Sequence, residues 1–82
     1  MDKILVVDDE RNVHYSFQRV LGGAYDVRSA YSGEEALQQL SDPALRLVLM
    51  DIRMPGKDGL TTLQELKQRR PDLPVIIMTA FV

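Results

Sequence analysis

The sequence predicts an α/β domain, a parallel sheet with helices on both faces. Three observations predict this class: short apolar, β-branched runs alternate with segments of helical apolar spacing, acidic residues follow two of the runs, and Gly or Pro residues separate the elements. Strands that alternate with helices are joined by right-handed crossovers and therefore run parallel. We expect one unit over residues 1–82, with the element order βαβαβαβ.

The first predicted strand is the apolar run 4–7, which leads into Asp8 and Asp9. An unbroken run of this kind is typical of a parallel strand buried on both faces. A helix is expected next, because apolar residues recur at helical spacing until Gly22 and Gly23 end it. The apolar residues of this helix are Val13, Phe17, Val20 and Leu21.

The next strand and helix have mixed polarity. Residues 25–29 alternate between apolar and charged or polar side chains, which indicates a strand at the edge of the sheet. Ser32 followed by Glu35 forms a capping box, so a second helix is expected to begin there and to end before Pro43.

The second half of the chain repeats the pattern. The run 47–50 predicts another buried strand, and it ends in Asp51. A third helix is expected to end before Pro71. The last strand, 75–78, is as apolar as the other buried strands, yet nothing follows it in the sequence to cover it. Such a strand is unsuited to an exposed edge, so we expect its partner to be missing or supplied by another chain. The apolar residues of the third helix are Leu60, Leu63 and Leu66.

Composition excludes several classes of function. The net charge of -2 and the scattered basic residues do not form the basic surface that binds nucleic acid. The absence of cysteine excludes disulfides and thiolate metal sites and fits a reducing compartment. No apolar run is long enough to span a bilayer, and no cleavage signal follows Met1. We therefore expect a cytoplasmic protein that binds neither membranes nor DNA directly.

Three carboxylates are expected to meet at one edge of the sheet. Asp8 and Asp9 follow one buried strand and Asp51 follows another, and ligands of parallel sheets bind outside the carboxyl ends of the strands. Charges so close oppose one another unless a cation joins them, and oxygen ligands favour Mg²⁺. Such a site suits phosphoryl transfer, with a carboxylate as nucleophile. Thr79, just past the last strand, can donate its hydroxyl there.

A plainer interpretation exists for each of these residues. Acids after strands often cap helices, which would explain any one of the three aspartates, although capping does not require acids at the matching ends of two buried strands. Thr79 alone is more typical of a loop hydroxyl. His14 and Lys3 are expected to be surface residues, and Arg70 to interact with the dipole of the third helix.

At these residues the chain resembles the response-regulator receiver family of two-component signalling. The resemblance covers nearly the whole chain in the expected order, and it implies a flavodoxin-like fold with strand order 2-1-3-4. Receivers of sigma-54-dependent transcription factors are the most similar group. The resemblance to the receiver family rests on four stretches, ILVVDDE (4–10), AYSGEEAL (30–37), LMDIRMPGKDG (49–59) and LPVIIMTA (73–80).

The resemblance also implies roles for individual residues. Asp51 would accept a phosphoryl group from a sensor histidine kinase. Asp9 and Asp51 would bind Mg²⁺ directly, Asp8 would act largely through water, and the main-chain carbonyl of Arg53 would be a further ligand. Thr79 would be the switch hydroxyl that moves toward the phosphoryl group. Self-phosphorylation and slow self-dephosphorylation of Asp51 would be the only enzymatic activity.

The sequence departs from the family at its end. A complete receiver continues through a fourth helix, a fifth strand and a fifth helix, and with them come a lysine and an aromatic switch residue that have no counterpart here. We therefore expect a truncated receiver with weakened phosphorylation that forms a homodimer through its last strand. An assembly module without switching is the alternative. A related phosphohydrolase is disfavoured because Asp8 lacks a second aspartate two residues later. The residues of the last strand are Val75, Ile76, Ile77 and Met78.

Overall fold

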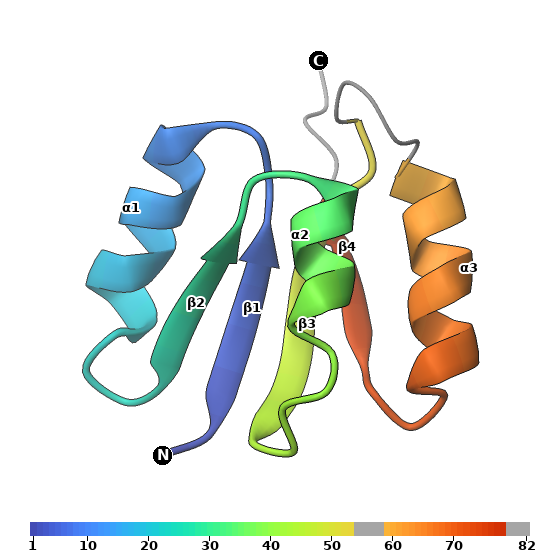
Figure 1. The fold of residues 1–82 in the computed structure, drawn as a ribbon. Coiled ribbons are helices and arrows are strands. Elements are labelled where there is room, and N and C mark those ends of the chain that lie inside the picture. Colours follow the sequence, from blue (N-terminus) through green and yellow to red (C-terminus); the bar gives the residue numbers. More distant parts are fainter. Residues whose placement is uncertain (54–58, 79–82) are drawn as a thin grey trace.

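A computed structural model describes residues 1–53 and 59–78. Its four parallel strands have the order β2-β1-β3-β4, and helices alternate with the strands along the chain (Figure 1). The predicted class, element order and strand order are therefore confirmed. The elements are β1 (Lys3–Val7), α1 (Arg11–Leu21), β2 (Asp26–Ala30), α2 (Gly33–Gln38), β3 (Leu45–Asp51), α3 (Gly59–Arg69) and β4 (Val75–Met78). Among the described residues, no helix combines the length and apolarity needed to cross a membrane.

Each face of the sheet carries its own apolar cluster. On one face, Leu5 and Val48 pack with buried residues of α2 and α3, including Ala36 and Leu66. On the other face, Ile4 packs with the apolar side of α1. Side chains of β1 point alternately to the two clusters, as the pleat of a strand requires. This explains why an unbroken apolar run forms the central strand.

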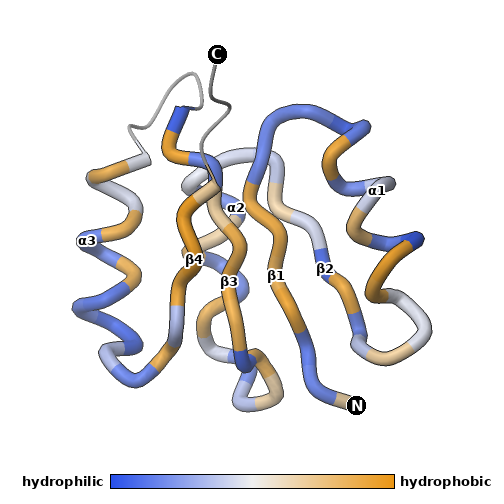
Figure 2. The backbone as a smooth tube through the Cα atoms, turned by 180° about the vertical axis from the view of Figure 1, so that it is seen from behind, coloured by the Kyte–Doolittle hydropathy of each residue, from blue (hydrophilic) through white to orange (hydrophobic). Residues whose placement is uncertain are grey.

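The strand β4 forms one edge of the sheet. It pairs with β3, and within the described part of the chain it pairs with no other strand. Figure 2 shows the hydrophobic residues of β1, β3 and β4 side by side. Ile76 remains 52% exposed and Ile77 38% exposed, on opposite faces of the strand. The expectation that the last strand presents uncovered apolar side chains is confirmed for these residues.

The helices differ from the sequence prediction in the exposure of two apolar residues and in one partner of the α2 capping box. Val20 of α1 and Leu60 of α3 are exposed, so both were wrongly assigned to apolar stripes. The capping box of α2 forms, because Ser32 Oγ accepts a hydrogen bond from the Glu35 amide at 3.2 Å. The Glu35 carboxylate in turn accepts from the amide of Tyr31 at 2.9 Å, one residue further back than in the usual box.

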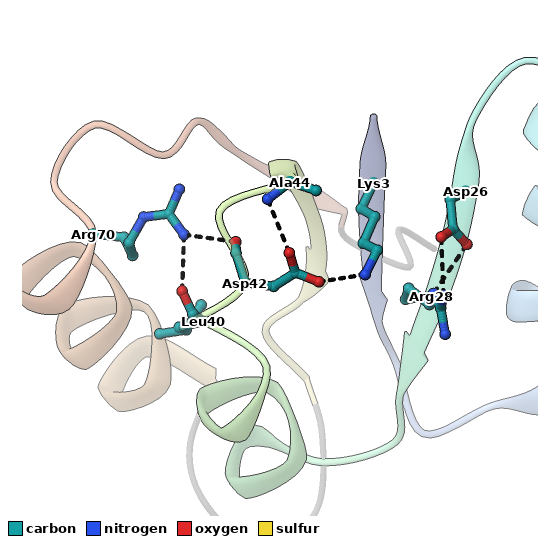
Figure 3. Close-up of polar contacts among 7 residues, drawn as sticks. All are labelled: Lys3, Asp26, Arg28, Leu40, Asp42, Ala44 and Arg70. Atoms are coloured by element: carbon teal, nitrogen blue, oxygen red, sulfur yellow. Dashed lines mark hydrogen bonds and ion pairs between the residues drawn. The ribbon is translucent and has the colours of Figure 1, made fainter. Parts of the chain in front are cut away.

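A polar bracket of Lys3, Asp42 and Arg70 joins three segments at the amino ends of the strands (Figure 3). Lys3 forms an ion pair with Asp42, whose other carboxylate oxygen accepts from the amide of Ala44 at 2.9 Å. Arg70 donates to the carbonyl oxygens of Leu40 at 2.8 Å and of Asp42 at 3.3 Å. Lys3 and Arg70 are therefore structural residues, and the expectation that Lys3 is a solvated surface charge was wrong.

Candidate metal-binding site

The register of the two central strands brings the three aspartates together. β1 and β3 are neighbours, and Val7 pairs with Met50, so the residues that follow them lie at the same edge of the sheet. Asp8, Asp9 and Asp51 each offer a carboxylate oxygen, and these oxygens lie within 4.8 Å of one another. The acidic cluster predicted from the sequence is therefore confirmed, at the edge opposite the polar bracket.

Hydrogen bonds to the main chain orient two of the carboxylates. Asp8 Oδ1 accepts from the amide of Glu10, and Asp51 Oδ1 accepts from the amide of Arg53, both at 2.8 Å. Glu10 is the N-cap residue of α1, and its side chain makes no capping bond. Asp8 therefore accepts a hydrogen bond from the amide of the N-cap residue, Glu10. This capping role does not explain why Asp9 and Asp51 lie beside Asp8.

The three carboxylates of the cluster repel one another when they are ionised. Asp8 is only 4% exposed, and this burial raises the pKa of its carboxyl above the usual value. The negative charges of Asp51 and Asp9 raise this pKa further, while the hydrogen bond from the Glu10 amide lowers it. A cation would offset the mutual repulsion of the carboxylates. Because all three ligands are carboxylate oxygens, the donor set fits a hard cation such as Mg²⁺.

The three aspartates differ in their exposure. Asp8 is buried, Asp51 is half-buried and Asp9 is exposed, so solvent reaches part of the cluster. Arg53 lies two residues beyond Asp51 and is exposed. The role of its carbonyl as a metal ligand stays a prediction. Thr79, the predicted switch hydroxyl, lies outside the described residues.

Gly59 allows α3 to approach the end of β3 closely. A Cβ atom at this position would lie 2.3 Å from the Cα atom of Ile52 and 2.4 Å from its carbonyl oxygen, much closer than real Cβ contacts. Ile52 directly follows Asp51. The absence of a side chain at Gly59 therefore permits the backbone packing beside the acidic cluster.

One residue beside the cluster was missed by the sequence prediction. His14 was expected at the surface, but it is only 4% exposed. Its Nε2 atom lies 2.7 Å from the carbonyl oxygen of Asp8, and its ring packs against Tyr31 with the centroids 4.3 Å apart. The available signal was its spacing, because His14, Phe17 and Leu21 follow one face of a helix.

Comparisons with known proteins agree with this geometry. The family model described as the response regulator receiver domain matches residues 4–82. The transcriptional regulatory protein ZraR of Salmonella typhimurium is 47% identical over 79 residues, which cover 95% of this chain and 18% of that protein. The DNA-binding transcriptional regulator NtrC of Escherichia coli is 45% identical over 78 residues, which cover 94% of this chain and 17% of that protein. This chain thus spans less than a fifth of these relatives.

Two solved structures share the fold of this chain. The response regulator TrrA of Thermotoga maritima, crystallised in complex with Mg²⁺-BeF, has a TM-score of 0.88 and 38% identity, and the match covers 99% of this chain and 71% of that chain. TrrA has also been crystallised in complex with the histidine kinase ThkA; that match has a TM-score of 0.87 and 37% identity and covers 100% of this chain and 72% of the other.

Proposed function

The chain belongs to the response regulator receiver family of two-component signalling, and we propose that Asp51 is the residue that accepts the phosphoryl group. Receivers are signalling modules rather than classical enzymes. The observation that carries the proposal is the convergence of Asp51 with Asp8 and Asp9 within 4.8 Å, at the carboxyl ends of two neighbouring strands. A lone acid at a strand end would not support it.

The proposed reaction is a transfer onto a carboxylate oxygen. An Asp51 oxygen attacks phosphorus, the bond between phosphorus and the donor's histidine nitrogen breaks, and the nitrogen keeps the electron pair. The Arg53 amide holds the Asp51 carboxylate in one orientation during the attack. Mg²⁺, when bound, neutralises the charge that develops on the phosphoryl oxygens. Asp8, Asp9 and Asp51 would hold this ion, with the Arg53 carbonyl as a further ligand.

The partners follow from the same proposal. A sensor histidine kinase is the proposed phosphodonor, supported by the crystallised complex of the related TrrA with ThkA. Transcriptional control is the proposed output, because the relatives ZraR and NtrC are transcriptional regulators. Self-phosphorylation from small donors and the switch role of Thr79 are part of the proposal. We place this activity in the cytoplasm, in keeping with the lack of cysteine.

Intact mass spectrometry tests the phosphoacceptor. The chain is incubated with acetyl phosphate and Mg²⁺, and we expect one added phosphoryl group that hydroxylamine removes. Asp51→Asn should abolish this adduct. Asp72→Asn is the matched control, because it removes an exposed acid at the far edge of the sheet. A chain that binds Mg²⁺ but gains no phosphoryl group would refute the proposed role of Asp51 and leave the family membership intact.

We further propose that two copies associate through β4. The proposal is supported by the exposed apolar residues Ile76 and Ile77 on a strand that is at the edge of the sheet formed by the described residues. The backbone groups of an edge strand can extend a sheet into a second chain. Static light scattering at micromolar concentration should give the mass of a dimer, and Ile76→Glu should give that of a monomer. A monomeric native chain under these conditions contradicts the proposal.

A further inference from the structure

His14 contacts the acidic cluster through the main chain. It lies near the start of α1, and its Nε2 atom is 2.7 Å from the carbonyl oxygen of Asp8, in the loop that precedes the helix. Only a nitrogen that carries hydrogen can donate to a carbonyl oxygen, so the contact requires a hydrogen on Nε2. Among the described residues, the buried Nδ1 atom of His14 has no hydrogen-bond partner. The polar contact of the imidazole within this part of the chain is therefore the one to the main-chain carbonyl of Asp8, a proposed metal ligand.

The hydrogen bond from His14 completes the anchoring of Asp8. The amide of Asp8 donates to the carbonyl oxygen of Ala30 at 3.1 Å, which ties it to β2. Its Oδ1 atom accepts from the amide of Glu10 at 2.8 Å. With His14 on the carbonyl, the amide, carbonyl and side chain of Asp8 all have protein partners. The peptide that links Asp8 to Asp9 is thus fixed in orientation.

An aromatic contact fixes the imidazole in turn. Tyr31 directly follows β2, and its ring packs against that of His14 at a tilt of 44°. The guanidinium of Arg11 lies 5.5 Å from the centroid of the same tyrosine ring. Tyr31 therefore contacts two residues of α1, and the His14 ring contacts both Tyr31 and the main chain of Asp8.

We propose that His14 is a positioning residue for the Mg²⁺ site, an inference that rests on the proposed function. It acts through the Asp8 carbonyl, and it orients the peptide from which the Asp9 carboxylate extends. Replacing a residue that hydrogen-bonds to a metal ligand commonly weakens metal binding by about 10- to 100-fold. A merely structural histidine would instead change stability alone.

The same helix supplies a matched control. Gln18 of α1 donates from Nε2 to the carbonyl oxygen of Val27 at 2.7 Å, so it also links the helix to the main chain of a neighbouring segment. Val27 is the second residue of β2, and the end of the strand that lies beside Asp8 is Ala30. His14→Phe keeps a planar ring and removes the donor, and Gln18→Met removes the donor from the control position. His14→Gln restores an N–H donor at position 14.

The first experiment measures the Mg²⁺ dissociation constant by calorimetry and the urea midpoint of unfolding. We expect His14→Phe to raise the dissociation constant about tenfold, Gln18→Met to leave it unchanged, and His14→Gln to give an intermediate value. Both donor-free variants are expected to lower the urea midpoint. The proposal is overturned if His14→Phe lowers the midpoint as Gln18→Met does and binds Mg²⁺ like the native chain.

A second experiment uses the metal-free chain, so that it does not depend on the proposed function. Amide hydrogen exchange at Glu10 reports the order of the Asp8 loop, and His14→Phe should speed this exchange while Gln18→Met should not. Nitrogen NMR of the native imidazole should find the hydrogen on Nε2. An Nε2 atom without hydrogen, or unchanged exchange at Glu10, would overturn the inference. If the native chain fails to bind Mg²⁺ while His14→Phe speeds exchange at Glu10, the result counts against the proposed function alone.

Discussion

The backbone of Ile52 occupies the space that a side chain at position 59 would need. A Cβ atom on Gly59 would lie 2.3 Å from Ile52 Cα. Gly59→Ala should therefore push the start of α3 away from the residue that follows Asp51. We expect a loss of about 1–3 kcal/mol in the free energy of unfolding, as for other overpacked sites, together with weaker Mg²⁺ binding.

Urea unfolding and Mg²⁺ calorimetry check the effect of Gly59→Ala. Gly23→Ala is the matched control, because nothing lies within 4 Å of the Cβ position there. The control should change the free energy of unfolding by no more than about 0.5 kcal/mol. Equal effects of the two substitutions would show that the close contact with Ile52 has no energetic importance.

Asp8→Asn should stabilise the metal-free chain while weakening Mg²⁺ binding. Burial and the neighbouring carboxylates raise the pKa of Asp8 in the folded state, so its ionised form is disfavoured there relative to the unfolded chain. At neutral pH the charge therefore reduces stability, and asparagine removes the charge while it can still accept from the Glu10 amide. We expect a higher free energy of unfolding in a chelator and a larger Mg²⁺ dissociation constant.

The pH dependence of the same substitution gives a second check. As the pH falls through the raised pKa of Asp8, the native carboxyl takes up a proton and the unfavourable charge disappears. The stability difference between Asp8→Asn and the native chain should shrink over this range and vanish below the usual value of 3.8. A metal-free Asp8→Asn chain that is less stable than the native one at neutral pH would contradict the electrostatic argument.

The Lys3–Asp42 ion pair should give the opposite pH dependence. The Lys3 ammonium, and after it the Ala44 amide, lower the pKa of Asp42 below 3.8. A lowered carboxyl pKa adds stability above the unfolded value, and this contribution is lost as the pH falls through the folded value. Asp42→Asn should therefore lower the thermal midpoint at neutral pH, and the gap should close below pH 3.8. Added salt should narrow the gap at neutral pH, since the pair is partly exposed. A gap that widens in acid would refute this assignment.

Arg70→Lys should destabilise the fold although it keeps the charge. The guanidinium donates to three carbonyl oxygens, those of Leu40, Asp42 and Leu45. A lysine ammonium cannot reproduce this planar arrangement of donors. We expect a loss of about 1–3 kcal/mol in the free energy of unfolding measured in urea. Arg69→Lys is the control at an exposed neighbouring position and should have little effect. Equal stability of the two variants would argue against a structural role of Arg70.

The features that could be predicted from the sequence are those with a local pattern. The run 4–7 and the Ser32 capping box predict their elements from adjacent residues, and parallel pairing then brings Asp8 and Asp51 to one edge. The burial of His14 could have been inferred from its helical spacing, but the hydrogen bonds of His14 and Arg70 could not. Each side chain contacts a main-chain carbonyl of another segment, and no sequence pattern marks such a carbonyl. Val20 was misassigned because packing, and not apolarity alone, decides which helix residues are buried.

The placement of β1 beside β3 also sets the order in which the ligand set can form during folding. Asp9 and Asp51 are about forty residues apart, and β2 with its flanking helices lies between them, so their meeting requires a long-range contact that is slow to close. A nascent chain that has formed only its first strand and helix carries two of the three aspartates, Asp8 and Asp9. Mg²⁺ can therefore bind only after the central strands have paired. We expect the ion to retard unfolding of the completed sheet and not to nucleate its formation.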